Sequence, residues 1–184
     1  MKKTLLIIVG LCLGFMTTYA QPNEAAIEAQ RSQMKKLERM VGQWQGSGWI
    51  QQGADKQNFN GTETVQSKLD GLALLVEGKF KSKGSAKENE KVINEKVIHE
   101  TLAVLSYNAK SQNFDFQTYL ANGMGGKHEL KITENGFEWG FQFPNGSTRY
   151  LIKVSNDVWF ETGEFSMDGK TWKKFFEMEL KRVK

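Results

Sequence analysis

The sequence predicts an all-β fold, an antiparallel up-and-down barrel of about ten strands preceded by a short helix. Three observations predict it. Helical spacing of apolar residues ends at Gly42, and apolar and polar residues alternate beyond it. Asn-Gly and Asp-Gly pairs, which suit tight hairpins, recur after position 60. Aromatic residues at alternate positions of 137–143 share one face of a strand. Strands joined by short turns favour a closed barrel, because closure removes exposed edges.

The first twenty residues are expected to be a secretory signal peptide. Two lysines precede an apolar run over 5–15, and Thr18 and Ala20 place small residues before the expected cleavage point. The run is shorter than the ~20 apolar residues that span a bilayer. We therefore expect the mature chain to begin at position 21, without an integral membrane anchor, in the periplasm or outside the cell.

Cys12 is the single cysteine of the chain and lies inside the expected signal peptide. A lipoprotein is an alternative, but a lipobox has a small residue before its cysteine, and Leu11 stands there. A mature chain without cysteine has no disulfide, thiolate nucleophile or cysteine-based metal site. Loss of Lys2 and Lys3 lowers the formal net charge from +4 to +2. So weak a positive charge excludes an electrostatic case for nucleic-acid binding.

Residues 21–41 are predicted to form the N-terminal helix, and 42–184 the barrel domain. Asn23 is a suitable N-cap, helix-forming residues follow it, and Gly42 ends the pattern. An apolar stripe at helical spacing should pack on the barrel. Its members are Ile27, Met34, Leu37, Met40 and Val41.

The barrel region contains ten or eleven alternating segments. Those at 92–98 and 100–108 are counted as separate strands, and the last segment, 171–182, either makes eleven or implies that two earlier ones merge. Asn60-Gly61 lies inside a predicted strand, where it could mark a bulge. The other pairs predict hairpin turns. They are Asp70-Gly71, Asn122-Gly123, Asn135-Gly136, Asn145-Gly146 and Asp168-Gly169.

The segment 37–48, which contains Gly42-Gln43-Trp44, resembles the opening of the calycin-type barrels, where a short helix leads into Gly-x-Trp. Segments 166–172 and 175–182 resemble the closing hairpin of the DUF1579 family, a lipocalin-like bacterial family. Tyr150, Trp159 and the stretch 161–164 fit the same pattern, so the resemblance covers about 33–183.

The resemblance implies a closed calycin-like barrel with Trp44 at its base and Arg182 lying across the indole. Such a cation–π contact is worth ~0.5–2 kcal/mol and would tie the first strand to the last. We expect this pair to have a structural role in barrel closure.

A barrel this rich in aromatic residues could enclose an apolar cavity with few polar anchors, the usual form of a small-molecule site. Glu161, Glu164 and Glu177 come from adjacent predicted strands. Either Glu161 and Glu177 lie inside beside Arg149, or the acids form surface pairs with lysines. The residues predicted to line a ligand cavity are Trp139, Phe141, Tyr150, Trp159, Glu161, Phe176 and Met178.

No catalytic, metal or cofactor site is predicted. His99 and His128 are the only histidines, each is followed by a glutamate that would point to the opposite face of a strand, and no zinc-ligand spacing occurs. We expect both at the surface or the barrel rim. Some calycin-like barrels bind haem through a histidine near the C-terminus, and this chain has none after position 128.

The first hypothesis is an exported lipocalin-like protein that binds a small apolar or amphipathic molecule without catalysis. It depends mainly on analogy of fold. The alternative is a filled, ligand-free barrel acting as a protein-interaction or envelope-stress module. A third hypothesis is an enzyme using barrel carboxylates with a converging histidine. The barrel interior distinguishes the three; ligand, partners and oligomeric state stay open.

Overall fold

The computed structural model describes residues 23–83 and 95–184, so the expected signal peptide lies outside the described residues. The helical part consists of α1 (Glu24–Met34), η1 (Lys35–Met40) and η2 (Leu69–Gly71). The strands are β1 (Gly42–Gln52), β2 (Asp55–Lys68), β3 (Ala73–Ser82), β4 (Val97–Asn108), β5 (Asn113–Leu120), β6 (Gly125–Thr133), β7 (Gly136–Phe143), β8 (Gly146–Ser155), β9 (Val158–Ser166) and β10 (Lys173–Arg182).

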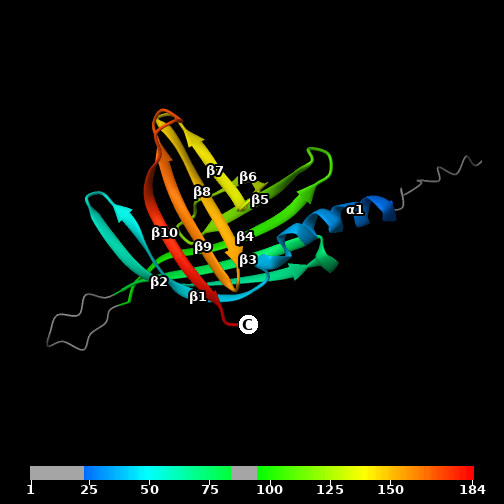
Figure 1. The fold of residues 1–184 in the computed structure, drawn as a ribbon, viewed down its shortest axis with the longest axis horizontal. Coiled ribbons are helices and arrows are strands. Elements are labelled where there is room, and N and C mark those ends of the chain that lie inside the picture. Colours follow the sequence, from blue (N-terminus) through cyan, green and yellow to red (C-terminus); the bar gives the residue numbers. More distant parts are fainter. Residues whose placement is uncertain (1–22, 84–94) are drawn as a thin grey trace, which may run out of the picture.

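The strands form one closed antiparallel barrel in which each strand pairs with the next along the chain. β1 closes the ring against β10, with Trp44 opposite Arg182. The predicted all-β, calycin-like barrel with a short N-terminal helix is therefore confirmed. Figure 1 shows α1 extending from one end of the barrel, while the hairpins β7–β8 and β9–β10 rise at the other. We call these the closed end and the open end.

The N-terminal helix changes its winding along its length. Asn23 accepts a hydrogen bond from the Ala25 N–H at 3.1 Å and caps α1. Residues 35–40 then form a 3₁₀-helix, where we had expected one helix throughout. A 3₁₀-helix has three residues per turn, so side chains three positions apart lie on one line. Met34, Leu37 and Met40 have this spacing, and all are buried.

Two expectations about the strands were wrong. The separate strands at 92–98 and 100–108 are one strand, β4, which begins at Val97; residues 84–94 lie outside the description. Asn60-Gly61 makes no bulge, because β2 pairs without register shift across it. Gly61 instead leaves room for a ring: a Cβ there would lie 2.2 Å from Phe80 Cδ1. Among the described residues, no helix is long and apolar enough to cross a membrane.

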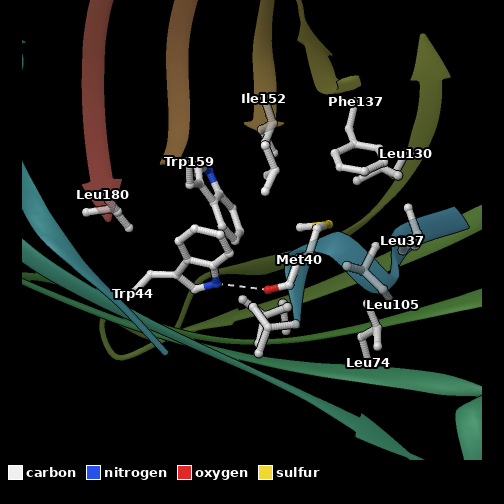
Figure 2. Packing of buried hydrophobic residues seen from close by; sticks show 14 of the residues in the cluster. Leu37, Met40, Trp44, Leu74, Leu105, Leu130, Phe137, Ile152, Trp159 and Leu180 are labelled. Carbon is white, nitrogen blue, oxygen red and sulfur yellow. Dashed lines mark hydrogen bonds between the residues drawn. The ribbon is translucent and has the colours of Figure 1, made fainter. Parts of the chain in front are cut away.

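The closed end is filled by side chains from the helix and the strands. Trp44 is buried, and its Nε1–H donates to the Met40 carbonyl oxygen at 2.9 Å, which joins the indole to η1 (Figure 2). The packing of this end is therefore a core rather than a cavity. Around this contact lie Leu37, Leu74, Leu105, Leu130, Phe137, Ile152, Trp159 and Leu180.

Candidate functional site

The open end has an aromatic lining. On β7 and β8, Trp139 and Tyr150 stack with ring centroids 4.4 Å apart and planes 9° from parallel. Phe116 meets the Trp139 indole edge-on at 5.0 Å, and Phe176 meets the Tyr150 ring at 6.0 Å. Phe141 occupies the same face of β7 and is 41% exposed. Because these inward-facing rings keep contact with solvent, this end is not filled in the way the closed end is.

The seven predicted lining residues divide between the two ends. Trp139, Phe141, Tyr150 and Phe176 line the open end, as described above. Trp159 instead packs edge-on against Trp44, with centroids 5.7 Å apart, and is 3% exposed. Met178 is buried in the same core. The seventh, Glu161, lies on the inward face of β9, opposite Met178 and Ile152 of the flanking strands.

Glu161 is a buried carboxyl group. It accepts a hydrogen bond from Trp159 Nε1–H at 3.1 Å. Burial raises the pKa of Glu161 to about 7, although the bond from Trp159 acts in the opposite direction. Burial also raises the pKa of Tyr150, and the charge of Glu161 adds to that rise. The two side chains share the inward face of neighbouring strands, because Tyr150 pairs with Gly163, two positions from Glu161.

A second buried carboxyl group, Glu63 of β2, faces the same interior. Burial raises the pKa of Glu63 to about 8, and the charge of Glu161 contributes. Its Oε2 atom is buried and has no hydrogen-bond partner among the described residues. Buried polar atoms are nearly always hydrogen-bonded, so an orphaned carboxyl oxygen marks a place where a further group can bind.

Glu63 owes its position to a glycine on the neighbouring strand. Gly78 of β3 pairs with Glu63, and a Cβ there would lie 2.6 Å from Glu63 Oε1 and 2.8 Å from Thr101 Cγ2. Sequence reasoning missed Glu63. The signal was present, because Glu63 shares the two-residue period of Phe59 and Val65, and both are buried.

Two further polar atoms facing inward lack partners in the described part of the chain. Gln57 Oε1 and Thr148 Oγ1 are buried and unpaired. Gln57 lies opposite Ile50, and Thr148 opposite Phe141, so both share the inward face of their strands. With Glu63, the described residues present three unsatisfied polar atoms on the inward faces of strands that also carry aromatic and apolar side chains, the combination found in small-molecule sites.

The other predicted acids lie outside the barrel wall. Arg149 pairs with Glu164 at 2.7 Å, and its guanidinium lies 4.1 Å from the Trp172 ring centroid. Lys174 pairs with Glu177 at 2.6 Å. The expected alternative of Glu161, Glu177 and Arg149 clustered inside is therefore wrong. The alternation of strand side chains puts Glu161 inside and the other two outside.

Both histidines lie toward the rim on inward-facing positions. His99 is exposed, and its ring centroid lies 5.6 Å from that of Phe80. The ring centroid of His128 lies 5.1 Å from that of Trp139. Burial lowers the pKa of both imidazoles. Over residues 23–83 and 95–184, neither histidine hydrogen-bonds to a glutamate, and no three His, Cys, Asp or Glu side chains gather as a metal site. The converging histidine that an enzyme hypothesis required is not among these contacts.

Arg182 lies across the base of the barrel. Its guanidinium carbon is 4.0 Å from the Trp44 ring centroid. It donates hydrogen bonds to Asp157 Oδ1 at 2.8 Å, to the Arg39 carbonyl oxygen at 2.9 Å and to the Val41 carbonyl oxygen. This one side chain joins β10 to the β8–β9 turn, to the end of η1 and to the residue before β1.

Two of the hollows in the described part of the chain lie on the outer surface. One of about 500 Å³ lies on the outer face of β2 to β5, between Thr62, Lys79 and Tyr119. The other, of about 640 Å³, lies beside η1 and is bordered by Lys36 and Ile132. Neither includes the buried carboxyl groups. We place the candidate site inside the barrel, because the unsatisfied polar atoms and perturbed carboxyl groups are there.

No family model matches the chain, and no curated protein matches it. Solved structures do. The crystal structure of Rv2717c from M. tuberculosis has a TM-score of 0.58 and 11% sequence identity, with 82% of this chain and 97% of that chain covered. The S-type phycobiliprotein lyase CPES from Guillardia theta has a TM-score of 0.53 and 15% identity, with 89% and 99% covered. At these identities the likeness shows a shared barrel fold.

Proposed function

We propose that this protein is an exported, lipocalin-like binding protein of the DUF1579 type that holds a small amphipathic molecule in the open end of its barrel. The mature chain would begin at position 21 and act in the periplasm or outside the cell. The proposed role is binding without catalysis.

One observation carries the proposal: inward-facing rings at the open end stay in contact with solvent, and the same barrel interior holds a buried carboxyl oxygen of Glu63 that has no hydrogen-bond partner among the described residues. The Trp139–Tyr150 stack and Phe176 supply flat apolar surface, and Glu63, Gln57 and Thr148 supply polar anchors. A molecule with an apolar body and one polar group would satisfy both. The fold shared with a phycobiliprotein lyase is compatible with such a role.

Native mass spectrometry tests the proposal. The full chain is expressed with export to a periplasm, and the mature protein is purified without detergent. We expect a discrete added mass that is lost on denaturation. Intact-mass measurement of the same sample also gives the N-terminus and so tests cleavage after Ala20.

Matched variants locate the ligand. Trp139→Ala removes half of the aromatic stack and should lower the occupied fraction severalfold. Trp49→Ala is the control, because Trp49 faces outward on β1, where Lys56 lies over its ring at 3.8 Å. Protein mass alone in repeated preparations would contradict a tightly held ligand and favour the ligand-free interaction barrel. Equal loss in both variants would contradict the interior site.

A further inference from the structure

We infer that the ligand carries a protonated nitrogen, as an amine or amidine, which the carboxyl groups of Glu63 and Glu161 bind at the inner end of the aromatic lining. This inference rests on the proposed function and names the chemical class of its ligand.

The first step is that two acids share one interior without a cation. Glu63 and Glu161 are both buried, and the charge of one raises the pKa of the other. None of the ion pairs among the described residues includes either of them. Ionised carboxyl groups inside a protein are costly unless an opposite charge compensates them. A bound cation would supply that charge to both at once.

The second step concerns the other charged or titratable groups that face the interior. Arg182 lies on the helix side of the Trp44 indole, where Asp157 and two carbonyl oxygens bind it. Lys173 begins β10 at the rim and is exposed. The remaining inward-facing titratable groups are His99 on β4, His128 on β6, and the phenols Tyr107 on β4 and Tyr150 on β8. Burial lowers the pKa of both imidazoles and raises the pKa of Tyr150, which favours the neutral form of all three.

The third step separates an organic cation from a metal ion. Metal sites in proteins use three or more ligands, and no three such side chains gather in the described part of the chain. Aromatic faces are the other element that recognises organic cations. Tyr150 shares the inward face with Glu161 of the neighbouring strand and stacks on Trp139, so such faces adjoin Glu161. An apolar body ending in a protonated nitrogen matches both features.

Three fluorescent probes with one dansyl body test the inference. Dansylcadaverine ends in an ammonium group, its N-acetyl derivative is neutral, and dansyl-6-aminohexanoic acid ends in a carboxylate. We expect the mature protein at pH 8.5 to bind the ammonium probe at least tenfold more tightly than the neutral one, and the anionic probe most weakly. Protons compete with the cation for the carboxyl groups. The affinity for the ammonium probe should therefore fall at least tenfold between pH 8.5 and 6, while that for the neutral probe stays level.

Isosteric variants identify the acids. Glu63→Gln and Glu161→Gln should each lower the affinity for the ammonium probe at least fivefold and leave the affinity for the neutral probe unchanged. Unchanged binding of the neutral probe also shows that each variant is folded. Glu179→Gln is the matched control, because Glu179 lies on the outward face of β10 and is exposed. Equal binding of ammonium and neutral probes would overturn the inference and leave the proposed function standing. Failure of all three probes to bind would count against both.

Discussion

The indoles of Trp44 and Trp159 meet edge to face, with ring centroids 5.7 Å apart and planes at 79°. Their N–H groups donate in different directions through the barrel. Trp44 donates to the Met40 carbonyl oxygen of the helix, and Trp159 donates to the Glu161 carboxyl group. This pair therefore lies between the filled closed end and the part of the interior that contains the carboxyl groups of Glu63 and Glu161.

Replacing Trp44 should cost stability. We expect Trp44→Ala to lower the free energy of unfolding by ~3–5 kcal/mol, because the buried indole leaves a cavity and the Met40 carbonyl loses its donor. Urea denaturation followed by circular dichroism measures the loss. Trp49→Ala, on the outward face of β1, should cost less than half as much. Equal losses of stability would show that Trp44 contributes no more to the fold than an outward-facing tryptophan.

Arg182 should stabilise barrel closure through several contacts together. We expect Arg182→Met to cost ~2–4 kcal/mol, since it removes the cation over Trp44 and charge-assisted bonds to Asp157 and two carbonyl groups. Arg182→Lys should recover less than half of the loss, because an ammonium group lacks the planar fork. Thermal melts compare these variants with Lys181→Met, an exposed neighbour that should melt like the parent protein.

Glu63 should make stability fall as the pH rises. Burial raises the pKa of Glu63 to about 8 in the folded protein from the ordinary glutamate value of 4.5, so between these values the folded state holds a proton that the unfolded state has released. Its favourable contribution is complete below pH 4.5 and is lost as the pH rises from there to about 8.

Glu63→Gln removes this titration. The variant should match the parent protein near pH 4 and melt several degrees higher at pH 8, because about 1 kcal/mol corresponds to ~2–4 °C in a chain of this size. Differential scanning calorimetry from pH 4 to 9 measures the difference in melting temperature between the variant and the parent protein. A difference in melting temperature that stays constant over this range would contradict a buried ionisable Glu63. The same would follow if Glu179→Gln reproduced the difference.

Gly78 should be required for the position of Glu63. We expect Gly78→Ala to cost ~1–3 kcal/mol, because the new methyl group overlaps Glu63 Oε1 and Thr101 Cγ2. A double-mutant cycle with Glu63→Ser should show a coupling of at least ~0.5 kcal/mol, since the shorter side chain removes one of the two overlaps. Strict additivity would mean that the methyl group and the carboxyl group do not compete for the same space.

The fold could be predicted from the sequence because its signals are local. The period of two along each strand, the turn pairs such as Asn145-Gly146 and the Asn23 cap each involve residues close together in the chain. The wrong division of β4 into two predicted strands also has a local cause. Alternation continues through a strand whatever its length, and no turn signal separates residues 98 and 100, so the sequence pattern contains nothing that divides this strand.

The site could be predicted only in part. Four aromatic residues expected at a cavity line the open end, but Trp159 and Met178 proved to be core residues. Their depth along the barrel axis depends on the stagger of ten strands, which a two-residue period does not contain. Alternation indicates which face a side chain occupies and leaves open which end of the barrel it reaches.

The sequence by itself determined a barrel of antiparallel strands with a helix before it, because backbone alternation and turn chemistry act over a few residues. Only the tertiary structure decided that Glu63 and Glu161 share one buried interior, although 98 positions separate them in the sequence. The effect of the Glu161 charge on the pKa of Glu63 depends on a through-space distance and on the exclusion of water, and both arise when β2 and β9 close into the same ring.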